Sequence, residues 1–196
     1  MYIFWDNSNI HISGYNSVLP KKEPIVNPKL FRTNFKNLLK LVCNNNKVDD
    51  VFLAGSVPPD TDAVWNYLRS INIKPHILTK TAHGTEQESV DILLQNKMLE
   101  CAAICMPSTS ELALLTGDGA INEFGSGFLN TLKLVKEKFN WDISVYAWGE
   151  TCNRHLREYA EINGKFVDLE NYYFNITFIQ RDKFYSDNFT RPSTPL

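Results

Sequence analysis

Strand-like and helix-like segments alternate along most of the chain, and this alternation limits the fold more than any other feature. Short apolar runs of strand length are each followed by a longer stretch whose apolar residues recur at helical spacing. About five such pairs succeed one another. Because parallel strands need long crossover connections, this order predicts a three-layer Rossmannoid α/β fold, with a mainly parallel sheet and helices on both faces.

Six segments have the character of strands in this pattern, namely residues 2–6, 50–56, 75–80, 111–119, 142–149 and 165–169. If the chain starts at the centre of the sheet and winds outward, the first five strands take the order 3-2-1-4-5. Strands 1 and 4 are then neighbours at the point where the winding reverses. Open α/β sheets bind their ligands at this point.

The segments between these strands are expected to be helical over residues 28–43, 61–71, 89–104, 127–139 and 152–162, with a polar loop after the first strand. Residues 1–170 form the predicted domain. Residues 171–196 are a C-terminal extension, with an added edge strand near residues 175–179 and then a flexible tail. No apolar segment reaches the length of a membrane helix, and the cysteines lack disulfide or zinc spacing. A soluble, cytoplasmic or otherwise intracellular protein is therefore expected, with no membrane partner.

Three aspartates are placed where such a fold would bring acids together. Asp6 and Asp118 directly follow the apolar runs of the first and fourth strands, and Asp91 lies in the first turn expected for the helix that leads into the fourth strand. An acid in a first helical turn is also favoured by the helix dipole, so stability alone could account for Asp91. The topology nevertheless predicts that all three carboxylates approach the same crevice.

Carboxylates that converge in this way repel one another. Either the pKa of at least one of them rises, or cations bind and neutralise them. Oxygen ligands of this kind suit Mg²⁺ or Mn²⁺, which usually share their coordination shell with a phosphate. The acids therefore indicate a metal site for phosphoryl chemistry.

At these positions the sequence resembles the NYN domains of the PIN-like nuclease superfamily. FWDNSN matches the D-x-x-N signature of the family, ESVDILL its VD motif at a helix start, and LLTGDG its S/T-G-D-G motif. The stretch GDGAINEFGSGFL, followed by a strand ending in YAWG, is similar to a variant of the family with an NEFG-x-GF loop. The resemblance spans roughly residues 2–170.

The resemblance implies a PIN-like fold and metal-dependent endoribonuclease activity, with single-stranded RNA as the expected substrate. Carried over by position, Asp6, Asp91 and Asp118 would be metal ligands and catalytic residues. Asn9 would be a catalytic residue that orients a ligand, a water or the scissile phosphate.

One position departs from the family pattern. Many members have a second acid two residues after the GD aspartate, where this chain has Ala120. Glu123, at the front of the next helix, is the leading catalytic replacement, with Asn122 beside it. If neither reaches the ion, the chain is a weakly active or inactive relative that only binds RNA.

Further substrate contacts are expected from residues near the strand ends. Asn7 and Ser8 follow Asp6 and could contact substrate, although a local turn explains them equally well. The net charge of −2 gives no overall attraction to a polyanion, so local cations such as Lys80 and Arg154 would have to meet the phosphates. A homodimer that completes the site is also compatible with the sequence.

Two other functions remain open. The same scaffold could serve as a non-catalytic RNA-binding or regulatory module. A metal-dependent phosphatase for small phosphoesters is a lower alternative, because the chain lacks the D-x-D spacing of a covalent aspartyl-phosphate enzyme after the first strand.

Overall fold

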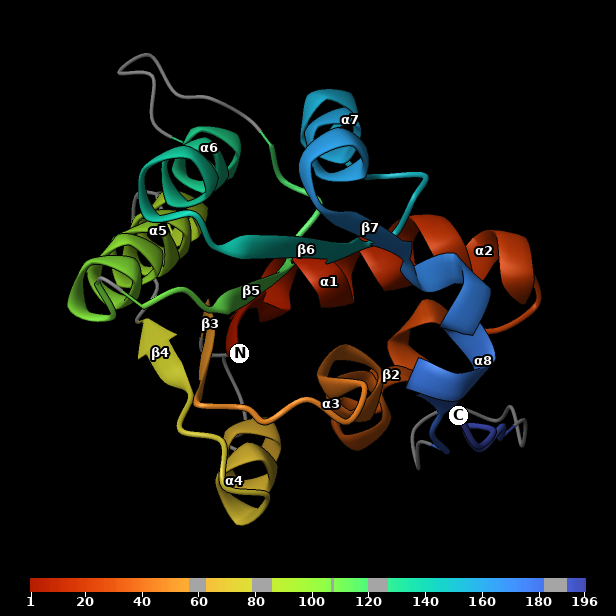
Figure 1. Ribbon diagram of the computed structural model, residues 1–196. Helices are drawn as coiled ribbons and strands as arrows, with labels where there is room; N and C mark the ends of the chain where they lie inside the picture. The colour runs from red at the N-terminus through yellow and green to blue at the C-terminus, as the bar shows by residue number, and fades with distance from the viewer. Residues whose placement is uncertain (57–62, 79–85, 107, 120–126, 182–189) are drawn as a thin grey trace.

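The computed structural model describes residues 1–56, 63–78, 86–106, 108–119, 127–181 and 190–196. Six parallel strands form its central sheet, in the order β4-β3-β1-β5-β6-β7 (Figure 1). They are β1 (Tyr2–Asp6), β3 (Asp50–Ser56), β4 (His76–Leu78), β5 (Glu111–Leu115), β6 (Asp142–Ala147) and β7 (Lys165–Asp168). The predicted order of the first five strands is confirmed, and β7 adds a sixth at the outside of β6.

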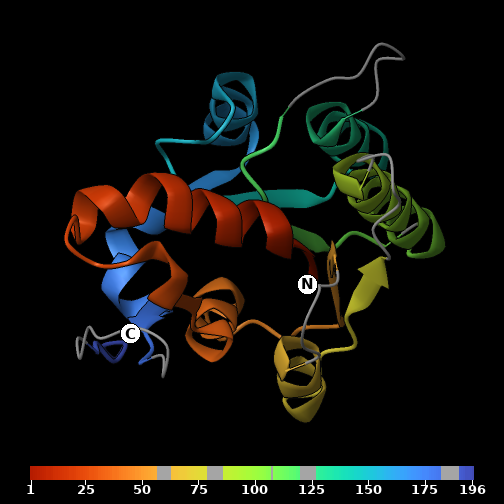
Figure 2. The same cartoon turned by 180° about the vertical axis from the view of Figure 1, so that it is seen from behind.

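Helices cover both faces of this sheet, because side chains alternate along each buried strand. On β1, Ile3 and Trp5 belong to the core on one face and Phe4 to the core on the other. The first face is covered by α3 (Phe35–Cys43), α4 (Ala63–Ser70), α8 (Tyr173–Ile176) and the N-terminal helices; the second is covered by α5 (Glu86–Ile104), α6 (Phe128–Phe139) and α7 (Arg154–Asn163) (Figures 1 and 2). None of the helices in the described part of the chain has the length and apolar character needed to cross a bilayer.

The segment after β1 is helical and not the polar loop that the sequence predicts. It consists of α1 (Asn7–Ser13), the π-helical η1 (Gly14–Val18) and α2 (Leu19–Lys22), which follow one another without a break (Figure 2). Ile10, Val18 and Leu19 are buried against the first face of the sheet. These widely spaced apolar residues stabilise the helices by packing, although the sequence around them is polar.

The helix predicted over residues 28–43 is divided into three elements, and only α3 is α-helical. A 3-10 turn, η2 (Pro28–Leu30), leads into the short strand β2 (Phe31–Thr33), which pairs antiparallel with β8 (Thr177–Ile179). The Asn34 side chain then accepts a hydrogen bond from the backbone N–H of Asn37 at 3.1 Å and caps α3. The strand expected near residues 175–179 therefore lies in a separate two-stranded sheet, and not at the edge of the main one.

Residues 190–196, expected as part of a flexible tail, are bonded to the body of the domain. Arg191 donates two hydrogen bonds of 2.9 Å to the Glu23 carboxylate, and a further one of 2.9 Å to the Thr177 carbonyl oxygen. Tyr173 donates its phenolic O–H to the same carboxylate at 2.7 Å. The 3-10 turn η3 (Leu169–Tyr172) precedes α8 and completes the connection from β7 to this region.

Candidate functional site

The carboxyl ends of β1 and β5 lie side by side and bring Asp6 next to Thr116. Trp5 pairs with Leu115 in the parallel register, so the residues that follow them are neighbours. The Thr116 hydroxyl donates to Asp6 Oδ2 at 3.3 Å. Both residues are almost completely buried, with exposed fractions of 0% for Thr116 and 1% for Asp6. The Asp6 carboxylate is therefore shielded from solvent by the surrounding protein.

Asn9 joins the start of α1 to the end of β5. Its backbone N–H donates to Asp6 Oδ1 at 2.9 Å, so Asp6 is the N-cap of α1. Its side-chain Oδ1 accepts a hydrogen bond of 2.8 Å from the backbone N–H of Gly117. One residue thus fixes both the Asp6 carboxylate and the turn that carries Asp118.

The turn after β5 is also held by the start of α7. Asp118 donates its backbone N–H to Thr116 Oγ1 at 3.2 Å, and Asn153 donates its backbone N–H to the Gly117 carbonyl oxygen at 2.8 Å. A Cβ added to Gly117 would lie 3.3 Å from Cys152 Cα and 3.4 Å from the Asn9 amide oxygen. These segments of the backbone approach so closely that only glycine fits here without a shift of its neighbours.

The environment of Asp6 disfavours a negative charge. Burial raises the pKa of its carboxyl group from 3.8 to about 6, although the hydrogen bonds from Asn9 and Thr116 act in the opposite direction. The negative charge of Asp118 raises this pKa further, so the two acids are close enough to interact. A proton or a cation bound in the crevice would relieve this repulsion.

Asp91 lies farther along its helix than the sequence predicts. Because α5 begins at Glu86, Asp91 is the sixth residue and belongs to the second turn, where the dipole of the helix terminus has little effect. Its side chain is half-buried, and α5 packs against β1 and β3. The sequence argument for Asp91 as a first-turn acid is therefore wrong, whereas its expected role as a ligand stays a prediction.

The structure describes three of the predicted substrate-binding residues, Asn7, Ser8 and Arg154. Asn7 and Ser8 lie over the end of β3, where a Cβ added to Gly55 would be 3.5 Å from Asn7 Cβ and 3.6 Å from Ser8 Oγ. Arg154 is the first residue of α7, and its exposed side chain forms a 2.7 Å ion pair with Glu158. The remaining predicted residues lie outside the described part of the chain: Lys80, Asn122 and Glu123, together with Ala120.

The donors in the crevice fit a hard divalent cation. Asp6 and Asp118 would supply carboxylate oxygens, and Asn7, the residue after Asp6, has a buried Oδ1 with no hydrogen-bond partner among the described residues. No group of three or more His, Cys, Asp or Glu residues in the described ranges could hold a metal ion. Mg²⁺ is commonly held by one or two carboxylates together with waters and substrate phosphates, so a pair of acids is compatible with such a site.

Three positioning residues were not identified from the sequence, namely Thr116, Gly117 and Asn153. Thr116 and Gly117 are part of the LLTGDG motif, but that motif by itself does not say which neighbour each would bond. The strand order does contain a signal, because it places the residue after Leu115 beside the residue after Trp5. Nothing in the local sequence links Asn153 to this turn.

Comparisons with known proteins extend only to the fold. No protein-family model and no curated protein matches this sequence. The structure is similar to the crystal structure of a protein of unknown function from Vibrio parahaemolyticus RIMD 2210633, with a TM-score of 0.58 and 12% sequence identity. The match covers 86% of this chain and 91% of that chain. At this identity, the likeness concerns the α/β architecture alone.

Proposed function

We propose that this protein is a metal-dependent endoribonuclease that hydrolyses RNA phosphodiester bonds at the crevice between β1 and β5. The observation that carries the proposal is the buried Asp6 carboxylate, fixed by Thr116 and Asn9 and electrostatically coupled to Asp118. The NYN-like motifs FWDNSN and LLTGDG, which contain these residues, support the same function. Buried acids at the switch point of a parallel sheet are typical of catalytic sites.

In this proposal, each residue of the network has a separate task. Asp6 and Asp118 present oxygens to Mg²⁺ or Mn²⁺, and Asp6 gives up the proton that its raised pKa favours when no cation is bound. Thr116 and Asn9 keep the Asp6 carboxylate in one orientation, so little rearrangement is needed when substrate binds. When bound there, the metal supplies charge stabilisation for the phosphodiester and lowers the pKa of the attacking water.

Asn9 would act by positioning, because its backbone N–H holds the Asp6 carboxylate and its amide oxygen holds the Gly117 N–H. The expected contributions of Asp91 and Glu123 belong to this proposal as additional metal or water ligands. Arg154 would have to exchange its ion pair with Glu158 for a phosphate, which is easy at an exposed position.

A non-catalytic RNA-binding module is the second candidate. It is favoured by Ala120, which stands where many members of the NYN family have a second acid. Such a module would use the same region and the same basic side chains, such as Arg154, to bind RNA without cleaving it.

Incubation of the purified protein with single-stranded RNA, in Mn²⁺, Mg²⁺ or EDTA, tests the proposal. Asp6→Asn and Asp118→Asn should each abolish cleavage, because they remove one of the two carboxylates. Asp142→Asn provides a matched control. Asp142 is an exposed acid at the amino end of β6, whereas Asp6 is at the carboxyl end of β1. The control variant should cleave like the wild type.

The outcomes separate the candidates. Metal-dependent cleavage that both crevice variants lose supports the nuclease. RNA retained on a filter without cleavage under every metal would favour the binding module. Hydrolysis of a small phosphomonoester, with RNA left intact, would instead indicate a phosphatase.

A further inference from the structure

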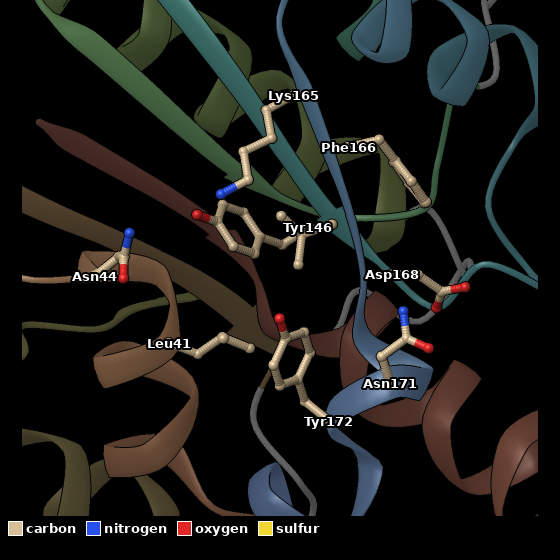
Figure 3. Close-up of a pocket in the computed structure, with 9 residues that line it drawn as sticks. Leu41, Asn44, Tyr146, Lys165, Phe166, Asp168, Asn171 and Tyr172 are labelled. Atoms are coloured by element: carbon tan, nitrogen blue, oxygen red, sulfur yellow. The ribbon is translucent and has the colours of Figure 1, made fainter. Parts of the chain in front are cut away.

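A separate pocket of about 410 Å³ lies between α3, β6, β7 and η3 (Figure 3). Its volume falls within the range of small-molecule sites, roughly 300–1,000 Å³. None of the residues that line it belongs to the candidate nuclease site around Asp6, Thr116 and Asp118. The pocket is therefore distinct from the candidate nuclease site, and its function is independent of the function proposed above.

Aromatic and aliphatic side chains line the inner part of the pocket, and the rest of its exposed lining is polar. Tyr146 and Val167 form its buried floor, with exposed fractions of 3% and 8%, and the half-buried Leu41 and Tyr172 line its sides. The Tyr146 O–H donates to the Val42 carbonyl oxygen at 3.3 Å, which fixes the phenol against the end of α3. Burial raises the pKa of Tyr146 to about 12, so this group is a neutral donor. Such a surface suits a flat ring.

The rim of the pocket carries one cation and two amides. Lys165, Asn44 and Asn171 are exposed at the opening, and Figure 3 shows the Lys165 ammonium directed toward the hydroxyl end of Tyr146. Lys165 forms no ion pair within the described part of the chain. Its positive charge is therefore available to a ligand.

The acid that lines this pocket does not cancel that charge directly. Asp168 Oδ1 accepts the backbone N–H groups of Gly149, at 3.0 Å, and Glu170, at 2.9 Å. Side chains alternate along β7, so Asp168 and Phe166 project to the face opposite that of Lys165 and Val167. Consistent with this alternation, Val167 packs in the core of the first face and Phe166 against that of the second.

From the aromatic floor and the available lysine, we infer that this pocket binds a small aromatic anion. The ring would lie against the half-buried Tyr172 and Leu41, with the anionic group at the Lys165 ammonium and the two amides at its edge. This chemistry is shared by nucleoside monophosphates and by aromatic carboxylates. The two sources differ in the anionic group and in the size of the ring system.

Ligand-observed NMR and calorimetric titration test this inference with four probes: adenosine 5′-monophosphate, 4-hydroxybenzoate, adenosine and inorganic phosphate. At least one of the two aromatic anions should bind at millimolar concentration or below, and more tightly than adenosine or phosphate. Binding by the monophosphate alone would identify a nucleotide site, and binding by the carboxylate alone an aromatic acid site. Failure of both aromatic anions to bind would overturn the inference.

Variants show whether binding occurs in this pocket. Lys165→Met and Tyr172→Leu should each weaken binding by about tenfold, the expected effect of losing one charge-assisted contact or one ring contact. Tyr172→Phe, which keeps the ring, should bind like the wild type, and so should Lys74→Met, which removes an exposed lysine on the loop before β4. Unchanged binding in both pocket variants would refute the site, provided that thermal unfolding shows them folded. Asp6→Asn should bind normally whether or not it cleaves RNA.

Discussion

Replacement of Asp6 by asparagine probes the electrostatics of the crevice most directly. Asp6 is 1% exposed, and burial raises its pKa from 3.8 to about 6. In the unfolded chain the carboxyl group returns to its ordinary value, so between these two pH values the folded protein binds more protons than the unfolded one. The stabilising contribution of Asp6 is therefore fully present below its unfolded pKa, and it is lost as the pH rises through about 6.

The size of the effect follows from the difference between the two pKa values. Each pH unit corresponds to about 1.4 kcal/mol, so ionised Asp6 costs the folded state about 3 kcal/mol above pH 7. Asparagine has nearly the same shape and still offers an oxygen to the Asn9 N–H, but it carries no charge. We expect Asp6→Asn to exceed the wild type in stability by about 3 kcal/mol above pH 7. This corresponds to roughly 6–12 °C in melting temperature for a chain of this size. Near pH 4 the difference should vanish.

Urea unfolding, followed by circular dichroism over a series of pH values, measures this difference. In the presence of Mg²⁺ or Mn²⁺, the wild type should gain stability above pH 7 while Asp6→Asn does not, because a bound cation favours the ionised carboxylate. Asp142→Asn, at a position 87% exposed, controls for the loss of an ordinary surface charge. A stability difference between the wild type and Asp6→Asn that stays constant with pH would refute the raised pKa. An absence of metal stabilisation would count against the cation site alone.

Two further predictions concern the stability of the fold. Arg191→Met removes one partner of the largely buried pair with Glu23, and urea denaturation should show a loss of about 3 kcal/mol. The same change at the exposed Arg154 should leave the unfolding midpoint unaltered, and equal effects at the two sites would argue against the buried pair as the cause. Gly164→Ala should destabilise the protein by about 3 kcal/mol, because its methyl group would collide with the Ile143 carbonyl oxygen. A wild-type melting temperature for this variant would show that the turn between α7 and β7 can open.

Local patterns failed where distant parts of the chain determine the structure. Residues 28–43 have helical spacing, yet Phe31–Thr33 are a strand because they pair with Thr177–Ile179 far along the chain. The residues after β1 have the polar composition of a loop, but they are helical because Ile10 and Leu19 are buried against the sheet. The helix α5 also begins about one turn earlier than the sequence predicts. This changes the local environment of Asp91, which stays a candidate ligand.

The sequence by itself determined the alternation of strands and helices, the order of the sheet and the placement of Asp6 and Asp118 at its switch point. These features follow from periodicity and from the handedness of crossover connections, which depend little on individual contacts. Only the tertiary structure decided which groups surround those acids and where the second pocket lies. Thr116 meets Asp6 through strand register, Asn153 meets Gly117 through the packing of α7, and Lys165 lines a pocket with Tyr172 through the turn after β7. Such contacts join residues that are distant in sequence, so the alternating pattern contains no information about them beyond the strand order, which places Thr116 beside Asp6.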